Sequence, residues 1–371
     1  MAERRARLRL GMVGGGRDAF IGAVHRIAAR IDDRYELVAG ALSSTPEKSL
    51  ASGRDLGLAE DRIYPDFETM ARAEAARADG IEVVAIVTPN NLHFAACKAF
   101  LAQGIHVICD KPVTATLAQA QELETLIHAS RCKFLLTHNY TGYPMIRMAR
   151  AMVAAGDLGP VRVINMEYIQ GWLAAGSEGK QAQWRVDPAR AGAGGCIGDI
   201  GTHAYNLACF VTGLTAESLS ADLQSYGPGR VLDDNAHILL RFAGGVRAML
   251  WASQIAAGYE NALKLRVVGE KASLEFSQED PNKLWFAPLG APRQMLTRGG
   301  PGFVGEVRLP AGHPEGFLEA FATLYADFAD VIQTGAVADP ALPGIIAGIE
   351  GLKFIRAAVA SSTENGSWQA L

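Results

Sequence analysis

The first 137 residues alternate short apolar runs with amphipathic stretches of helical length. The apolar runs occupy residues 8–13, 35–42, 83–88, 105–109 and 133–137, and helix-length stretches such as residues 21–31 and 92–103 separate them. Uninterrupted apolar runs are typical of strands buried on both faces, and their alternation with helices predicts a parallel sheet. We therefore expect residues 1–137 to form an α/β domain with helices on both faces of the sheet.

Apolar and polar residues follow a different rhythm after residue 137. Longer strands are predicted at residues 161–170, 235–242, 246–253, 263–268 and 272–276. Gly244-Gly245 is typical of a two-residue hairpin, and Gly269-Glu270-Lys271 indicates another short connection. Residues 138–371 should therefore form an α+β domain around a large, mostly antiparallel open sheet.

The last part of this second domain carries helical patterns and one long loop. An apolar stripe at helical spacing predicts a helix that packs in a core, and its members are Phe317, Phe321, Leu324, Phe328 and Ile332. Residues 345–360 predict a final helix, for which packing back on the first domain is one arrangement. The Gly/Pro-rich stretch from Pro288 to Pro314 predicts a long irregular loop.

The composition is that of an ordinary globular protein, and the net charge bears on which classes of partner are expected. The 371 residues, of which 49% are hydrophobic and 20% charged, predict two domains with ample cores. A formal net charge of −4 gives no electrostatic reason to expect nucleic acid or an anionic membrane as partner. The five cysteines lack the paired spacing of a disulfide framework or a metal site. Without a secretion-like N-terminus or a membrane-length apolar run, we expect a cytoplasmic protein.

Glycines follow the first predicted strand and open the first predicted helix. Gly14, Gly16 and Ala19 have the G-x-G-x-x-A spacing that turns the backbone tightly and lets a helix N-terminus face a pyrophosphate. A second interpretation lengthens the loop, which also contains Arg17, and gives Gly22 the third role. A glycine turn without a ligand is the alternative, but the position between strand and helix favours a Rossmann-type dinucleotide site.

The end of the second strand bears on the choice of dinucleotide. An acidic residue at this place, about 20 residues beyond the glycines, would bind the ribose 2′-hydroxyl of NAD. Here the strand ends in Ser43 and Ser44, with Lys48 shortly after. Hydroxyl and ammonium groups can bind a 2′-phosphate, so the sequence favours NADP within NAD(P), although serines also end strands for reasons unrelated to a ligand.

Two further strands end in polar motifs. Thr88, Pro89, Asn90 and His93 follow one strand, and Asp110-Lys111-Pro112 follows the next. Carboxyl ends of parallel strands meet at one edge, where ligands of open α/β sheets bind, so we place both motifs in the cofactor site. The alternative for the first is an Asn cap with a proline turn. A lysine beside a nicotinamide would donate to the substrate oxygen and favour alkoxide character.

A carboxylate and an imidazole lie four residues apart in the second half of the chain. We expect Asp199 and His203 to share one helical turn and to work together. The unperturbed pKa of a histidine is about 6.5, and that of a lysine about 10.4, so proton transfer falls to His203. Lys111 would position the hydroxyl, and Asp199 would orient the imidazole or bind the hydroxyl. The alternative is a capping aspartate with an ordinary histidine.

Taken together, these motifs resemble the Gfo/Idh/MocA family of glucose-fructose oxidoreductase and inositol dehydrogenase. The resemblance covers nearly the whole chain and includes Gly194-Gly195 ahead of Asp199. It implies NAD(P)-dependent oxidation or reduction at a secondary alcohol of a sugar or cyclic polyol, with Lys111, Asp199 and His203 at the catalytic positions. It also implies that the open sheet pairs subunits into homodimers or homotetramers. Two features depart from the family: Asp110 replaces the usual glutamate, and the glycine loop is longer.

Candidate substrate contacts lie around these motifs. Aromatic rings suit the apolar faces of sugars, and Arg and Asn suit hydroxyl groups, whereas core packing is the alternative for each tryptophan. The candidates are Asn139, Tyr140, Trp172, Trp184, Arg185, His313 and Glu315, the last of which could instead favour a helix N-terminus. Two other functions fit the same motifs: a redox-neutral glycoside-cleaving enzyme with bound NAD(P), and a non-catalytic sugar or dinucleotide sensor.

Overall fold

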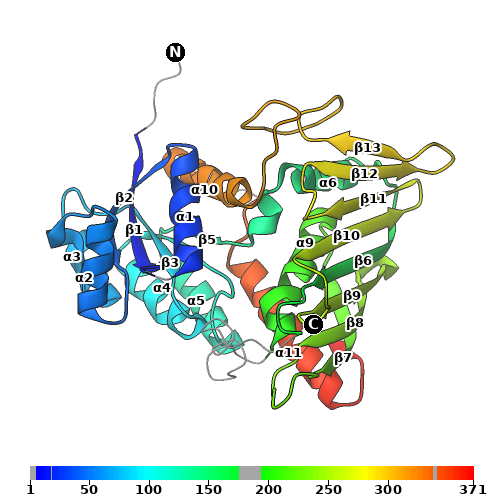
Figure 1. Ribbon diagram of the computed structural model, residues 1–371, viewed down its shortest axis with the longest axis horizontal. Helices are drawn as coiled ribbons and strands as arrows, with labels where there is room; N and C mark the ends of the chain where they lie inside the picture. Colours follow the sequence, from blue (N-terminus) through cyan, green and yellow to red (C-terminus); the bar gives the residue numbers. More distant parts are fainter. Residues whose placement is uncertain (1–5, 18, 175–193, 337–340) are drawn as a thin grey trace. The chain divides into compact units, whose positions relative to one another are not determined.

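The computed structural model describes residues 6–17, 19–174, 194–336 and 341–371. The chain divides into two compact units (Figure 1). The first contains Met1–Gly142 and Phe317–Ile349, and the second contains Tyr143–Gly316 and Glu350–Leu371. Across the described part of the chain, no helix combines the length and the apolar character needed to cross a membrane.

The first unit is built on a five-stranded parallel sheet. Its strands are β1 (Leu8–Gly14), β2 (Tyr35–Ala41), β3 (Val83–Val87), β4 (His106–Cys109) and β5 (Phe134–Leu136). They are ordered β2-β1-β3-β4-β5, and every neighbouring pair is parallel. The strand order reverses between β1 and β3, the kind of position at which open α/β sheets bind ligands. The predicted Rossmann sheet is confirmed, strand by strand.

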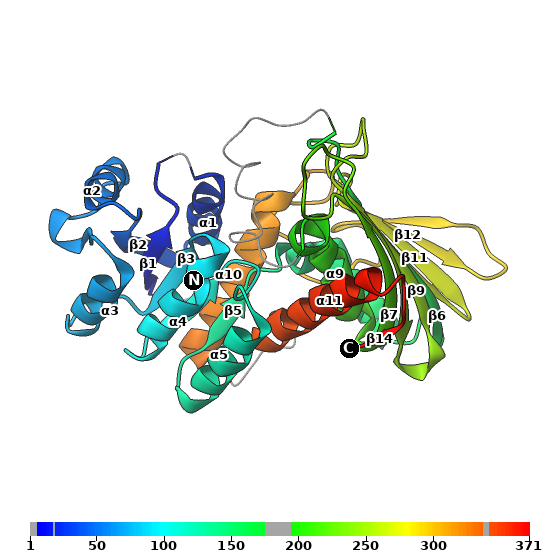
Figure 2. The same ribbon diagram turned by 90° about the horizontal axis from the view of Figure 1, so that it is seen from below.

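Helices cover both faces of this sheet (Figure 2). The helices are α1 (Phe20–Ile31), α2 (Pro46–Asp55), α3 (Phe67–Ala75), α4 (His93–Leu101), α5 (Leu117–Ala129) and α10 (Phe317–Thr334), with short 3-10 turns η1 (Glu60–Arg62), η2 (Asn90–Leu92) and η3 (Asn139–Gly142). Leu10 and Met12 pack toward α1 and α10. A Cβ on Gly11, on the opposite side of β1, would meet Met70 of α3 at 2.4 Å, so the two faces have separate cores.

Helix α10 completes the first unit, although the sequence assigns it to the second domain. Its stripe residues Phe321, Leu324 and Phe328 are buried in one cluster with β1, β2 and α1. The Tyr325 hydroxyl lies 2.8 Å from His25 Nδ1, and the Tyr325 carbonyl accepts from the Tyr35 hydroxyl. The predicted apolar stripe is therefore core, but of the first unit.

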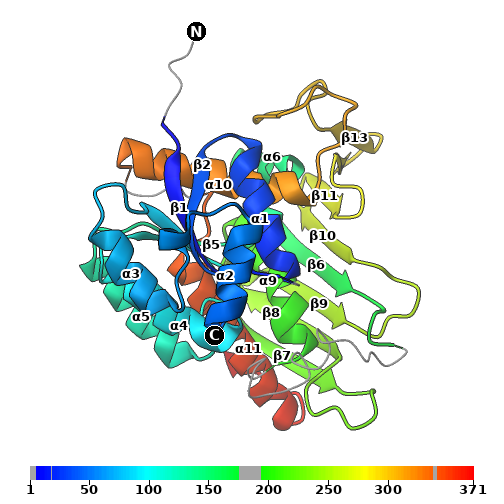
Figure 3. The same cartoon turned by 60° about the vertical axis from the view of Figure 1, so that its left-hand side comes forward.

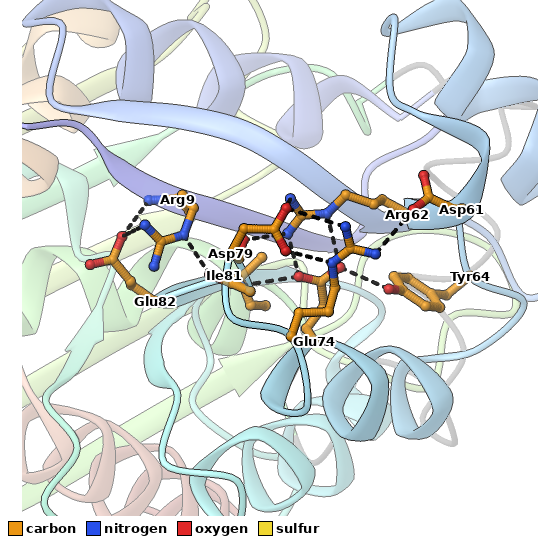
Figure 4. A network of polar contacts seen from close by, with 10 residues as sticks. Arg9, Asp61, Arg62, Tyr64, Glu74, Asp79, Ile81 and Glu82 are labelled. Atoms are coloured by element: carbon orange, nitrogen blue, oxygen red, sulfur yellow. Dashed lines mark hydrogen bonds and ion pairs between the residues drawn. The ribbon is translucent and has the colours of Figure 1, made fainter.

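A buried ion pair ties α3 to the sheet (Figure 4). Arg62 and Glu74, which are 7% and 1% exposed, pair through both carboxylate oxygens. The same carboxylate accepts from the Tyr64 hydroxyl at 2.8 Å and from the Ile81 backbone at 3.1 Å. Burial, followed by the hydrogen bond to Glu74, raises the pKa of Tyr64. Glu74 thus joins η1, α3 and the residues that lead into β3.

The second unit is built on a nine-stranded sheet (Figure 3). Its strands are β6 (Val161–Ile169), β7 (Ala216–Gln224), β8 (Asn235–Phe242), β9 (Arg247–Ser253), β10 (Ala262–Gly269), β11 (Ala272–Ser277), β12 (Lys283–Pro288), β13 (Gln294–Thr297) and β14 (Gln369–Ala370). They are ordered β13-β12-β11-β10-β6-β9-β8-β7-β14. All neighbours are antiparallel except β6 and β9, so the predicted mostly antiparallel sheet is confirmed.

Helices lie along one face of the nine-stranded sheet (Figure 2). They are α6 (Pro144–Ala154), α9 (Thr202–Thr212) and the later part of α11 (Ile345–Thr363). Tyr205 of α9 stacks on Phe354 of α11, with ring centroids 4.4 Å apart. Buried and exposed side chains alternate along β8, as expected for a sheet with helices on one side.

The stretch from Pro288 to Pro314 is more ordered than its composition predicts. It contains β13, and its later part is anchored by a buried ion pair between Arg298 and Glu315, 2.9 Å apart. Arg298 also donates to the carbonyls of Leu309 and His313. Glu315 accepts from the backbone of Arg308 and Leu309, so its carboxylate holds this loop rather than the N-terminus of α10.

Candidate active site

The glycine loop follows β1 and packs tightly against the first turns of α1. Gly14 and Gly15 have φ of 79° and 72°, a conformation that strains other residues. A Cβ on Gly22 would lie 2.3 Å from the Gly15 Cα, whereas Ala19 sits at the N-cap of α1. The close loop–helix contact of a dinucleotide motif therefore falls to Gly22, in agreement with the lengthened-loop interpretation.

The lengthened part of the loop is anchored to α2. The Gly16 backbone donates to the Leu42 carbonyl at 3.1 Å, and the Arg17 backbone donates to Ser52 Oγ at 3.1 Å. The Arg17 guanidinium makes a bidentate contact with Asp55, at 2.5 and 2.8 Å, and this hydrogen bonding lowers the pKa of Asp55. An open cavity of about 430 Å³ lies here, lined by the loop, α1 and α2.

The end of β2 presents polar groups without a carboxylate. Ser43 is half-buried, and Ser44 and Lys48 are exposed. Ser43 Oγ accepts from the Thr45 backbone at 3.4 Å. These three side chains are open to a ligand on the surface of the first unit.

The loops after β3 and β4 are fastened together by a buried histidine. His93 is 1% exposed, and its ring nitrogens lie 2.9 Å from the Thr88 carbonyl and 2.6 Å from the Pro112 carbonyl. Both ring nitrogens of His93 therefore contact backbone carbonyls. The ring is buried behind the carboxyl edge of the sheet and is not exposed at that edge. Thr88 Oγ1 is buried and has no hydrogen-bond partner among the described residues, which leaves it open for a ligand.

Asp110 fixes the loop that carries Lys111. Its Oδ1 accepts from the Lys111 backbone at 2.9 Å and from Thr137 Oγ1 at 2.8 Å. Burial and the charge of Lys111 lower the pKa of His138 to about 3, so His138 is neutral beside the lysine. Asp110 thus fixes the backbone of Lys111 through its carboxylate.

In the second unit, Asp199 and His203 lie where two kinds of helix meet. Asp199 belongs to a π-helical turn (Ile197–Gly201, η4), and His203 is in the first turn of α9. The sequence predicts one ordinary helical turn, and the wider π turn is a correction; such turns are frequent at functional sites. His203 is 7% exposed, with its ring 6.3 Å from that of Tyr168. Asp199 Oδ2 accepts from Gln254 Nε2 at 2.8 Å.

A buried aspartate caps this turn. Asp233 accepts from the backbones of Gly195 and Ile197, at 2.6 and 2.8 Å, and from the Cys196 thiol at 3.1 Å. Burial and then the Asp233 charge raise the pKa of Cys196, which stays a thiol. Gln254 and Asp233 are absent from the residues predicted by sequence; for Asp233 the signal was the Asp-Asp pair directly before β8.

The candidate substrate residues are divided between the units. Asn139 and Tyr140 are buried in η3, where the Tyr140 ring packs 6.4 Å from that of Phe317. Asn139 Nδ2 has no hydrogen-bond partner within the described ranges. Trp172 is half-buried in the second unit and donates to Gln170 at 3.0 Å.

The remaining candidates contribute little to a described site. The His313 side chain is exposed. The His313 carbonyl and the Glu315 carboxylate both accept hydrogen bonds from Arg298. Trp184 and Arg185 lie outside the described residues. Lys111 belongs to the first unit, and Asp199 and His203 belong to the second.

Comparison with known proteins identifies both halves of the chain. A model of an oxidoreductase family with an NAD-binding Rossmann fold matches residues 8–138. A model of the GFO/IDH/MocA C-terminal domain matches residues 146–275. The oxidoreductase YfiI of Bacillus subtilis, whose activity is uncharacterized, is 39% identical over 97% of this chain and 96% of its own length.

Solved structures agree over the whole length. An oxidoreductase from Sinorhizobium meliloti is 54% identical, with a TM-score of 0.90 over 98% of this chain and 100% of its own. An inositol dehydrogenase homolog from Azotobacter vinelandii, in complex with NADH and myo-inositol, is 37% identical, with a TM-score of 0.91 over 98% of both chains. The protein is an oxidoreductase with an NAD-binding Rossmann domain, and it belongs to the GFO/IDH/MocA family.

Proposed function

We propose that this protein transfers a hydride between NAD(P) and a secondary alcohol of an inositol, another cyclic polyol or a sugar. The observation that carries the proposal is the turn at Asp199 and His203, where Gln254 and the Asp233 cap hold an acid and an imidazole on neighbouring turns. The similarity to an Azotobacter protein that binds NADH and myo-inositol supports the same class of substrate.

The first unit has the groups that a dinucleotide needs. Positive φ at Gly14 lets the backbone approach a pyrophosphate closely, and the N-terminus of α1 favours its charge. Thr88 Oγ1 offers a buried hydroxyl at the carboxyl edge of β3. We assign Gly16, Arg17, Pro89 and Asn90 to the surroundings of the same ligand. When bound, the nicotinamide ring accepts or supplies the hydride.

Three side chains handle the proton and the charge. His203 takes the hydroxyl proton, because the unperturbed pKa of histidine, about 6.5, lies near working pH. The Lys111 ammonium donates to the same oxygen and stabilises the negative charge that develops there. Asp199 accepts from a substrate hydroxyl or from the imidazole and so fixes the orientation of the pair. Asn139 and Trp172 remain our candidates for further hydroxyl and ring contacts.

We also propose a preference for NADP over NAD. Ser43, Ser44 and Lys48 supply hydroxyl and ammonium donors after β2, all of them at least partly exposed. Residues 42–45, directly after β2, include no carboxylate to bind a 2′-hydroxyl or to repel a 2′-phosphate, and the next acidic residue is Glu47 in the first turn of α2. The preference is a difference in affinity and leaves the chemistry at Lys111 and His203 unchanged.

A screen of inositols, other cyclic polyols and sugars tests this function. We expect one or more of them to reduce the cofactor, followed by its nicotinamide absorbance, with a lower KM for NADP+ than for NAD+. A lower KM for NAD+ would overturn only the NADP preference. Product release without accumulation of reduced cofactor would indicate redox-neutral cleavage instead, and binding without any turnover would indicate a sensor.

We further propose that the open face of the nine-stranded sheet pairs with a second copy of this chain. Val163, Leu239, Met249 and Trp285, from four strands, share that face and are 38–56% exposed. Arg266 and Glu275 pair on the same face, so it carries both charges. Sedimentation equilibrium should give the mass of a dimer or tetramer, and Leu239→Glu with Met249→Glu should reduce it. A monomeric wild type contradicts the pairing.

A further inference from the structure

Gln254 is a buried residue with its main chain fixed on both sides. It directly follows β9 and is 3% exposed. Its backbone N–H donates to the Asp234 carbonyl at 2.9 Å, and its carbonyl accepts from the Leu173 backbone at 3.0 Å. The side chain then directs Nε2 at Asp199 Oδ2, 2.8 Å away. Both backbone groups of Gln254 are hydrogen-bonded, so the fold sets the point from which this amide extends.

The other carboxylates near this turn have their own donors. Asp234 accepts from the Tyr226 and Gly227 backbones and pairs with Arg230 at 2.8 Å. Asp233 accepts from two backbone groups and from a thiol. Burial, and then the charges of Asp233, Asp234 and Asp199, raise the pKa of the Cys196 thiol, and Asp233 accepts from this thiol at 3.1 Å.

A neutral hydrogen-bond donor at position 254 suits a region that contains several carboxylates. A carboxylate at position 254 would be the fourth acid of this region and would add repulsion. A lysine or arginine would neutralise Asp199 and compete for it as a charge partner. The amide donates one hydrogen bond and adds no charge, so Asp199 keeps its negative charge for the substrate hydroxyl or the His203 imidazole.

We propose that Gln254 is a positioning residue that orients Asp199 and keeps it ionised through the hydrogen bond from its amide. The inference rests on the proposed function, since it gives Asp199 a task in catalysis. It makes two separable claims. The first claim is that the protonation of Asp199 changes when the Gln254 amide is replaced. The second claim is that kcat changes as a result.

Gln254→Glu is the sharpest test because it replaces the donating NH2 with an acidic oxygen of nearly the same size. Two carboxylates in hydrogen-bond contact share a proton, so the acid limb of the kcat–pH profile should move up by at least about one pH unit. Among the described residues, the titratable or charged groups near this turn include His203, Tyr168, Cys196, Asp233, Asp234 and Arg230, and all of them are the same in both proteins. An acid limb that does not move overturns the inference.

Gln224→Glu is the matched control. Gln224 is half-buried on β7, and its Nε2 donates to Asp222 Oδ2 at 2.6 Å in an exposed glutamine–aspartate hydrogen bond that does not involve Asp199. The control should leave the pH profile unchanged. An equal shift in both variants would mean that any added charge moves the profile, and would overturn the specific role of Gln254.

Gln254→Met keeps the bulk and removes the donor without adding charge. We expect kcat to fall about tenfold or more while the KM for the dinucleotide stays within about twofold, because the first unit binds the cofactor. This variant decides the question if Gln254→Glu does not fold. A lower melting temperature with unchanged kcat would mean a merely structural role and would overturn the inference.

A readout independent of turnover separates this inference from the proposed function. ¹³C-carboxyl NMR of the full-length protein, with Asp199→Asn to assign the resonance, follows the titration of Asp199 directly. A midpoint raised by Gln254→Glu supports the inference even if no polyol is turned over, in which case only the proposed function fails. An unmoved midpoint together with polyol turnover leaves the function intact and refutes the inference.

Discussion

Replacing His203 with alanine should lower kcat by about 10²- to 10⁴-fold, the contribution typical of a positioned general base. His203 is 7% exposed and lies in the first turn of α9, next to the capped turn that holds Asp199. Alanine removes the imidazole and favours the helix, so the chain should stay folded. The measurement is steady-state reduction of the cofactor with the best polyol of the screen, across pH 5 to 10 as the assay range.

His237→Ala is the control for this loss. His237 is an exposed histidine on β8 of the same unit, stacked on Trp251 and away from the Asp199 turn in the sheet. It should leave kcat within about twofold. Wild-type turnover in the His203 variant would remove the imidazole from the mechanism and leave Lys111 and Asp199 from the predicted catalytic set.

Replacing Glu74 with alanine should lower the free energy of unfolding of the first unit by about 3–5 kcal/mol, the cost typical of breaking a buried ion pair by removing one partner. The change leaves the Arg62 guanidinium, which is 7% exposed, with its longer contacts to Asp79, at 3.8 Å to the carboxylate and 3.2 Å to the carbonyl, and also removes the acceptor of the Tyr64 hydroxyl and the Ile81 backbone (Figure 4). Urea unfolding followed by circular dichroism measures the effect, with the two units allowed separate transitions.

Glu60→Ala is the matched control, because Glu60 pairs with Arg54 at 2.7 Å on the surface of the same unit. Both side chains are more than half exposed, and such pairs contribute about 0–1 kcal/mol. Equal losses in the two variants would contradict the argument from burial. A double variant, Arg62→Met with Glu74→Leu, should recover most of the stability because it leaves no unpaired charge.

The parallel sheet was predictable because each of its strands is a short, separate apolar run. β8 and β9 were equally clear, since the two glycines between them adopt positive φ and close the hairpin. β7 escapes prediction because its buried positions hold residues such as Ala216, Leu219 and Ala221, which give only a weak apolar pattern. The stripe on α10 was evident, but periodicity says only that a face is buried, not which domain buries it.

The candidate catalytic side chains could be predicted from the sequence, but the residues that hold them in place could not. Lys111, Asp199 and His203 stand in recognisable strings, whereas Gln254 is one polar residue at a strand end and has no motif around it. His93 belongs to a recognisable motif, but its ring contacts two backbone carbonyls, those of Thr88 and Pro112, in the interior of the first unit. Glu315, offered as a substrate contact, is paired with Arg298, 17 residues away in sequence, and such pairings cannot be predicted from spacing.

The place of α10 in the first unit has a consequence for how the chain folds during synthesis. Residues up to Gly142 leave the ribosome with one face of their sheet covered by α1 but not yet by α10, because Phe321, Leu324 and Phe328 come from a helix that ends at Thr334. At ~5–20 residues per second, the intervening stretch takes roughly 10–40 s to translate. During that interval the nascent nucleotide-binding half exposes the apolar surface that α10 will cover, and chaperones have their longest opportunity to bind it.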